Sequence, residues 1–126
     1  MNYHFPKKER LKRHKAIGTL FQKGKRWRGR FVILYYVRQA EVSVGNHQVL
    51  FSVPKSRLRK AVDRNKIKRR LREAYRKHRS LMPPSFFSLG YVYVHRRLIP
   101  YHALAEEVKA SMNFLKLAAS KGRDAG

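Results

Sequence analysis

The sequence predicts a small α+β domain built on one sheet, and three observations predict it. Helical and strand patterns follow one another in the order helix, strands, helix, strand, helix. The length of 126 residues suits one compact domain. Hydrophobic residues make up 43% of the chain, which is enough to bury a core. We therefore expect residues 1–126 to form a single domain, with residues 1–8 and 120–126 flexible.

The first half of the chain predicts one helix and two strands. Residues 10–23 read as a helix because their apolar side chains can lie towards one side, and Gly24 suits the position after a helix end. Residues 31–37 are a continuous run of β-branched and aromatic residues, typical of a strand covered on both faces. Residues 49–53 predict a second strand. The turn signal Gly45-Asn46 between the strands favours an antiparallel hairpin.

The second half predicts two more helices around a third strand. Residues 63–79 give the clearest helix, with Asp63 as the expected N-cap. Residues 91–94 predict a strand, and residues 102–119 predict a last helix with one apolar face. The apolar stripe of the first of these helices consists of Ile67, Leu71, Ala74 and Tyr75.

The charge of the chain points to a polyanionic partner. Lys and Arg number 31 against 7 Asp and Glu, which gives a formal net charge of +24. A small domain with this charge repels itself unless a nucleic acid, an anionic membrane or an acidic protein neutralises it. The basic segments carry only narrow apolar stripes, whereas a lipid-binding helix has a wide apolar face. Nucleic acid is therefore the favoured partner.

No segment predicts insertion into a membrane or secretion. The longest uncharged stretch, residues 81–94, is shorter than the ~20 apolar residues that a spanning helix needs. Residues 1–10 are polar and basic, unlike a signal peptide. We expect a soluble, cytoplasmic protein with no membrane partner.

The helix over residues 63–79 is the strongest candidate for contact with nucleic acid. Glu73 is its one acidic residue after Asp63, whereas a solvated basic face normally interleaves Glu with Lys. A helical projection places cations over most of the surface that the apolar stripe leaves open. Such groups pair with phosphates, and Arg can do so through two hydrogen bonds. These cations are Lys66, Lys68, Arg69, Arg70, Arg72 and Arg76.

Aromatic residues beside basic ones suggest a second type of contact. Aromatic rings on a sheet can stack on unpaired bases, but any one such ring more often belongs to the core. The sequence leaves open which face of the sheet is accessible. The rings in question are Trp27, Tyr35, Tyr36, Phe51, Tyr91 and Tyr93.

A protein-based active site finds no support in the sequence. The chain has no cysteine, its acidic residues are scattered, and its 6 histidines lack a metal-ligand spacing. We expect no catalytic side chain and no protein-bound metal. If the chain takes part in catalysis, another molecule supplies the chemistry.

The segment Arg64-Asn65-Lys66, continued by the Lys- and Arg-rich run up to Arg76, resembles the signature helix of the bacterial ribonuclease P protein component. Phe51-Ser52-Val53-Pro54-Lys55 before it and Tyr91-Val92-Tyr93-Val94 with Arg96 after it agree with the same family. The resemblance covers residues 5–118. Lys66 stands where the family usually has Arg, and Ile17 stands where an aromatic residue is common.

The resemblance implies a mixed four-stranded sheet packed with three helices, including a left-handed crossover through the signature segment. It implies the protein subunit of an endoribonuclease that removes the 5′ leader from precursor tRNA. In that family the RNA subunit is the catalyst and binds Mg²⁺. The implied partners are ribonuclease P RNA and precursor tRNA, with no obligate protein partner.

The resemblance also implies roles for individual residues. The signature helix would bind the catalytic RNA, and a cleft between the first helix and the sheet would hold the single-stranded leader. The signature residues carried over are Arg64, Asn65, Lys66, Lys68, Arg69 and Arg72, to which the helical projection adds Arg70 and Arg76. The candidates for the leader cleft are Ile17, Phe21, Phe31, Tyr35 and Phe51.

Two alternatives come from other classes of protein. A ribosomal protein would match in size and charge, but it would often carry long basic extensions, whereas the basic residues here lie on a compact helix. A DNA-binding helix-turn-helix protein needs two helices joined by a short turn, and here strand-like segments flank the basic helix on both sides.

Overall fold

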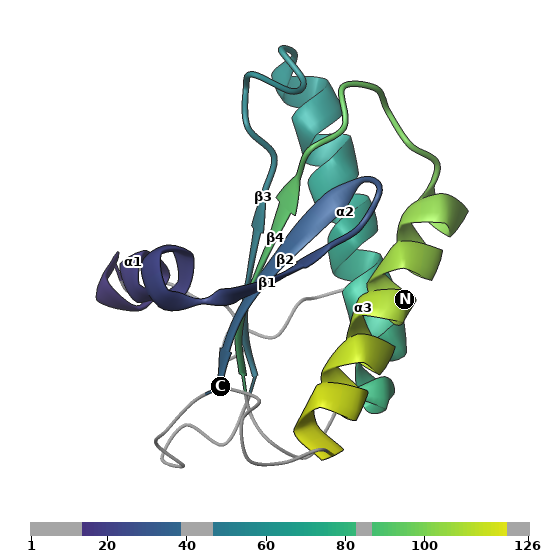
Figure 1. Ribbon diagram of the computed structural model, residues 1–126. Coiled ribbons are helices and arrows are strands. Elements are labelled where there is room, and N and C mark those ends of the chain that lie inside the picture. The colour runs from purple at the N-terminus through teal and green to yellow at the C-terminus, as the bar shows by residue number, and fades with distance from the viewer. Residues whose placement is uncertain (1–13, 39–46, 83–86, 121–126) are drawn as a thin grey trace.

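The computed structural model describes residues 14–38, 47–82 and 87–120. The described residues form three helices and one four-stranded sheet, which confirms the predicted α+β class. Helices α2 and α3 cover one face of the sheet, and α1 lies on the other (Figure 1). The elements are α1 (His14–Lys23), β1 (Lys25–Arg28), β2 (Val32–Arg38), β3 (Gln48–Ser52), α2 (Ala61–His78), a 3₁₀ turn (Arg79–Leu81), β4 (Phe87–Tyr93) and α3 (Tyr101–Ser120). Of the segments expected to be flexible, residues 1–8 and 121–126 lie outside the described residues.

The sheet is mixed, with the strand order β1-β2-β4-β3. Strand β2 pairs antiparallel with both β1 and β4, whereas β3 pairs parallel with β4. Helix α2 connects the two parallel strands, so the crossover through the basic segment is present. The predicted hairpin of residues 31–37 with residues 49–53 is wrong, because β1 and β4 occupy both edges of β2. The turn signal at Gly45-Asn46 lies outside the described residues.

Strand β1 was not predicted, and β4 begins at Phe87 rather than at Tyr91. Three of the four β1 residues are basic and exposed, so no apolar alternation marks it; only Trp27 is partly buried. Pairing with β2 makes these residues a strand. The end of α1 is as predicted, since the amide of Gly24 donates to the carbonyl oxygen of Leu20 at 3.0 Å.

Helix α2 begins two residues before the predicted N-cap. Its N-cap is Lys60, which makes no side-chain capping bond, and Asp63 lies in the first turn. The amide of Arg64 donates to the carbonyl oxygen of Lys60 at 3.1 Å. The apolar period that predicted this helix starts only at Ile67, so it carried no information about the first turn. Asp63 still favours the helix there through its charge.

The core fills the space between the sheet and the pair α2 and α3. The predicted stripe of α2 is confirmed, because Ile67, Leu71, Ala74 and Tyr75 are all fully buried. From β2, the side chains of Val32, Leu34 and Tyr36 face this layer, and the ring of Tyr36 lies 5.7 Å from that of Phe114 on α3. The rest of the buried set comes mainly from β4 and α3: Phe87, Leu89, Tyr91, Tyr93, Leu104, Val108, Met112 and Leu115.

A buried carboxylate joins α3 to the connection between β1 and β2. Glu107 is 9% exposed, and its two oxygens accept backbone N–H bonds from Arg30 at 2.7 Å, Phe31 at 2.8 Å and Val32 at 2.7 Å. A Cβ atom at Gly29 would lie 2.4 Å from this carboxylate, so only glycine fits there without a shift. One side chain of the helical layer, that of Glu107, thus fixes the connection between β1 and β2.

Within the described residues, no helix combines the length and the apolar character needed to cross a lipid bilayer.

We expect Glu107→Ala to lower the free energy of unfolding by about 3 kcal/mol or more, because three backbone N–H groups lose a charged acceptor. Urea unfolding followed by circular dichroism measures this. The exposed neighbour Glu106 supplies the control, and Glu106→Gln should change the free energy by less than about 0.5 kcal/mol. Equal, small effects of the two substitutions would contradict the anchoring role of Glu107.

We expect the free protein to lose stability in alkali because of its buried tyrosines. Burial raises the pKa of Tyr93 to about 12 and also raises the pKa of Tyr91. The unfolded chain ionises near the ordinary value of 10.0, so the stabilisation is complete below that pH and is lost as pH rises towards 12. Unfolding free energies measured at several pH values above 9 test this. A value independent of pH up to 12 would contradict it.

Candidate nucleic-acid interface

The first turn of α2 is fixed to the segment that precedes it. Nη1 of Arg64 donates to the carbonyl oxygens of Leu58 at 3.0 Å and Arg59 at 2.7 Å. Leu58 is buried, whereas Arg59 and Lys60 are exposed. Arg64 therefore orders a connection whose own cations point to solvent.

The basic face of α2 surrounds its buried stripe, as the helical projection predicts. Asn65, Arg69 and Arg72 are exposed, and Lys66 and Lys68 are partly buried at the margins. We call these five residues the α2 face. Within the described part of the chain, no ion pair involves Lys66, Lys68 or Arg69.

Arg70 differs from the cations of the α2 face. It is partly buried, and its Nη1 donates to the carbonyl oxygen of Ile99 at 2.8 Å. This bond holds the connection between β4 and α3 against α2. One guanidinium of the predicted RNA-binding set thus has a structural partner.

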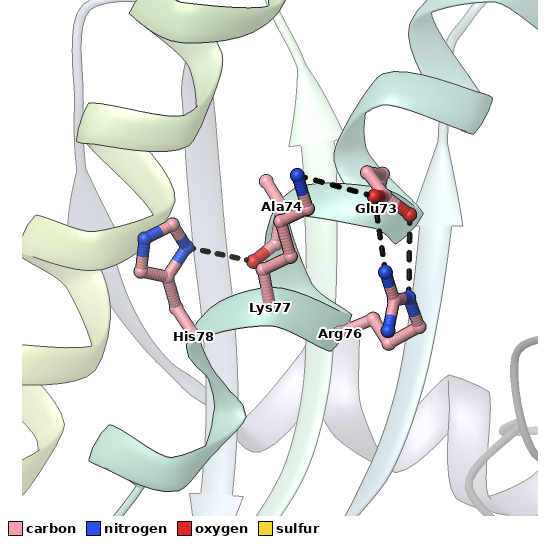
Figure 2. Close-up of polar contacts among 5 residues, drawn as sticks. All are labelled: Glu73, Ala74, Arg76, Lys77 and His78. Atoms are coloured by element: carbon pink, nitrogen blue, oxygen red, sulfur yellow. Dashed lines mark hydrogen bonds and ion pairs between the residues drawn. The ribbon is translucent and has the colours of Figure 1, made fainter. Parts of the chain in front are cut away.

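The last turns of α2 are partly neutralised by one carboxylate (Figure 2). Glu73 accepts from Nε and Nη2 of Arg76 at 3.3 and 3.1 Å and lies 3.5 Å from Nζ of Lys77. Nδ1 of His78 lies 3.0 Å from the carbonyl oxygen of Ala74. Glu73 therefore lowers the positive charge of this end of the helix.

A second group of predicted residues meets on the opposite side of the sheet, under α1. The rings of Phe21 on α1 and Tyr35 on β2 are 4.9 Å apart and nearly perpendicular. Gly90 on β4 permits this close approach, because a Cβ atom there would lie 2.8 Å from Cδ2 of Leu20 and 3.3 Å from Cζ of Phe21. Ile17 lies one turn before Phe21 on the same face of the helix. Ile17, Phe21 and Tyr35 are all partly exposed, and we call them the aromatic site.

Phe51 does not belong to this group, and its prediction as a leader-binding residue is wrong. Its ring is 8% exposed and packs 6.1 Å from Tyr75 and 5.7 Å from Tyr91, on the face covered by α2 and α3. The alternation of β3 directs it into the core.

Phe31 lies apart from the aromatic site, at the end of the sheet where β2 begins. Its ring lies 5.3 Å from that of His95, and the guanidinium of Arg30 lies 5.5 Å from its centroid. The neighbours of the partly buried Phe31 are thus Arg30 and His95 rather than Phe21 and Tyr35.

The sequence-based prediction missed one cation beside the aromatic site. Arg26 on β1 is the cross-strand partner of Tyr35, and paired residues project from the same face of a sheet. Arg26 is exposed, so a positive group flanks the ring. No sequence pattern marked this residue, because β1 has no apolar alternation and only the pairing of β1 with β2 places Arg26 beside Tyr35.

Among the described residues, no three His, Cys, Asp or Glu side chains come together as a potential metal site.

Comparisons with known proteins show which family the chain is similar to. The family model described as Ribonuclease P matches residues 5–116. The ribonuclease P protein component of Chlorobaculum tepidum is 38% identical over 80 residues, covering 61% of this chain and 52% of that protein. The corresponding protein of Chlorobium phaeobacteroides is 40% identical over 73 residues, covering 56% and 50%. The chain spans about half the length of these curated relatives.

Two solved structures share the fold. The Staphylococcus aureus RNase P protein superposes with a TM-score of 0.72 at 22% identity, covering 86% of this chain and 95% of that one. The RNase P protein from Thermotoga maritima gives 0.68 at 20% identity, covering 86% and 96%.

Proposed function

The chain belongs to the ribonuclease P protein family, and we propose that it acts as the protein subunit of this tRNA-processing endoribonuclease. In this proposal it binds the catalytic RNA and the single-stranded 5′ leader of precursor tRNA. The observation that carries the proposal is the family match over residues 5–116, which includes both the α2 face and the aromatic site. The two surfaces lie on opposite sides of one sheet (Figure 1), so two RNA segments could be bound at once.

The α2 face would bind the catalytic RNA. Asn65, Arg69 and Arg72 are exposed, and a guanidinium can donate two parallel hydrogen bonds to a phosphate. Lys66 and Lys68 would add charge without that geometry. Arg64 and Arg70 would act by holding the chain segments beside the helix, because their guanidinium groups already donate to backbone carbonyls. Arg76 would contact RNA only while paired with Glu73.

The aromatic site would bind the leader. Unpaired bases stack on exposed rings, and Tyr35 and Phe21 present such rings beside the exposed cation of Arg26. Stacking tolerates different bases, which suits leaders of varied sequence. Ile17 would add apolar contact in place of a ring.

The protein would promote catalysis by electrostatics and positioning. Its cations would neutralise phosphates of both RNAs, so Mg²⁺ held by the catalytic RNA would act at lower concentration. The described residues offer no group of ligands for a metal, and we assign no step to a protein-bound ion. The proposal includes a cytoplasmic location and no obligate protein partner.

We expect this protein to switch on cleavage of a 5′-extended precursor tRNA by bacterial ribonuclease P RNA at a low Mg²⁺ concentration where the RNA alone is inactive. The measurement is gel analysis of the cleavage site, with RNA alone at high Mg²⁺ as the control for a competent ribozyme. Cleavage at the mature 5′ end supports the proposal. If the RNA alone cleaves at high Mg²⁺ but the protein does not activate it at low Mg²⁺, the result contradicts the proposal. It then favours a ribosomal RNA-binding protein.

We expect Tyr35→Ala to weaken binding of precursor tRNA to the assembled enzyme by about tenfold, because one stacked base contributes about 1–3 kcal/mol. Binding of mature tRNA, which lacks the leader, should not change. Leu117→Ala serves as the matched control, since Leu117 is 64% exposed on α3, which covers the other face of the sheet. Equal losses for precursor and mature tRNA would refute the assignment of the leader to the aromatic site.

A further inference from the structure

We propose that Gly90 is a positioning residue for the leader, because its missing side chain seats α1 on the sheet and so sets how Phe21 meets Tyr35. We call the contact of Leu20 and Phe21 with Gly90 the α1 seat. The inference rests on the proposed function, since it concerns the same aromatic site. Gly90 contacts no RNA in this proposal and acts only through α1.

Strand pairing places Gly90 within a row of residues that crosses the sheet on the side of α1. Gly90 is the cross-strand partner of Tyr35 on one side and of Leu50 on the other, and Tyr35 is the partner of Arg26. Paired residues project from the same face of a sheet. Arg26, Tyr35 and Leu50 are exposed or partly exposed. The row therefore lacks a side chain at Gly90, directly beside the ring of Tyr35.

Helix α1 fills this space with Leu20 and Phe21. A Cβ atom at Gly90 would lie 2.8 Å from Cδ2 of Leu20 and 3.3 Å from Cζ of Phe21. The first distance is about 0.7 Å shorter than the closest favourable separation of two carbon atoms, ~3.5 Å. Leu20 is fully buried, so neighbouring atoms surround the methyl group that would have to move. A side chain at position 90 therefore pushes α1 away from the sheet.

The junction between α1 and β1 leaves the helix one way to respond. Only Gly24 separates the two elements, and its amide donates to the carbonyl oxygen of Leu20 at 3.0 Å. A Cβ atom at Gly24 would lie 2.2 Å from that oxygen and 3.3 Å from the carbonyl oxygen of Tyr36 on β2. Because this junction is so closely packed, a push at Leu20 tilts α1 about Gly24. The tilt separates Phe21 from the ring of Tyr35.

The position of α1 confines the effect to one side of the sheet. Helix α1 packs on β2 and β4, on the face opposite to α2 and α3 (Figure 1). The core between the sheet and these two helices lies on the other face, so a displacement of α1 does not require a change in the α2 face. The volume of residue 90 thus sets the geometry of the aromatic site separately from the surface proposed to bind the catalytic RNA.

The test combines Gly90→Ala with Leu20→Val, which removes one carbon atom where the other substitution adds one. Substitutions that conserve volume are tolerated best in a packed interior. Gly18→Ala is the matched control, because it adds the same methyl group to α1 at a position where a Cβ atom has nothing within 4 Å. Binding of precursor tRNA and of mature tRNA is measured with enzyme assembled from bacterial ribonuclease P RNA and each variant.

We expect Gly90→Ala to reduce the preference for precursor over mature tRNA by about fivefold or more, which is the lower value for the loss of one stacked base. Gly90→Ala/Leu20→Val should return to within about twofold of the wild-type preference. Gly18→Ala should keep that preference. A wild-type preference in Gly90→Ala, or a double variant that discriminates no better than the single one, overturns the inference.

Circular dichroism melting shows which variants are folded. If Gly90→Ala does not fold, the double variant decides the question. Recovery of both the fold and the preference for precursor tRNA supports the α1 seat. Recovery of the fold without the preference, or a double variant that does not fold, overturns the inference.

The wild-type protein separates this inference from the proposed function. If the wild-type enzyme binds precursor and mature tRNA equally, the assignment of the leader to the aromatic site fails. The α1 seat is then tested without RNA, through nuclear Overhauser contacts between the rings of Phe21 and Tyr35, whose centroids are 4.9 Å apart. Loss of these contacts in Gly90→Ala and their return in the double variant still support the seat. Unchanged contacts in Gly90→Ala oppose it.

Discussion

A single buried carboxylate determines how the two layers of this domain are joined. Glu107 extends from α3 to the connection between β1 and β2 and accepts three backbone N–H bonds there. Because the amide of Val32 is buried and would otherwise lack a partner, the connection can take up few other positions. Gly29 leaves the space that the carboxylate needs. Strand β1, which carries the cross-strand partner of Tyr35, Arg26, adjoins that junction.

The sheet separates the apolar layer from the surfaces proposed to bind RNA. Alternation along β2 sends Tyr36 into the core and leaves Tyr35 on the side of α1. Helix α1 covers that side only in part, through the approach of Leu20 and Phe21 to Gly90. An aromatic ring therefore remains accessible next to a cation, while the opposite face supports α2 and its charges.

The charge of a basic side chain does not by itself predict whether that side chain is available to bind RNA. Arg64 and Arg70 donate to backbone carbonyls, and Arg76 pairs with Glu73. These groups shape and position the surface, whereas Arg69 and Arg72 are exposed on it. The chain has a net charge of +24 and few carboxylates, and one of them, Glu107, binds backbone amides instead of pairing with a basic side chain of the described residues.

The sequence by itself determined the α+β class, the stripe of α2, the end of α1 at Gly24 and the cationic character of the signature helix, because each is a local pattern of period, cap or charge. Only the tertiary structure decided the strand pairing, since β1 carries no apolar alternation and β3 pairs with β4 rather than with β2. It alone placed Phe51 in the core and Tyr35 on the other face. Which face of a strand is covered depends on the helices packed against it, and that contact is not encoded within the strand.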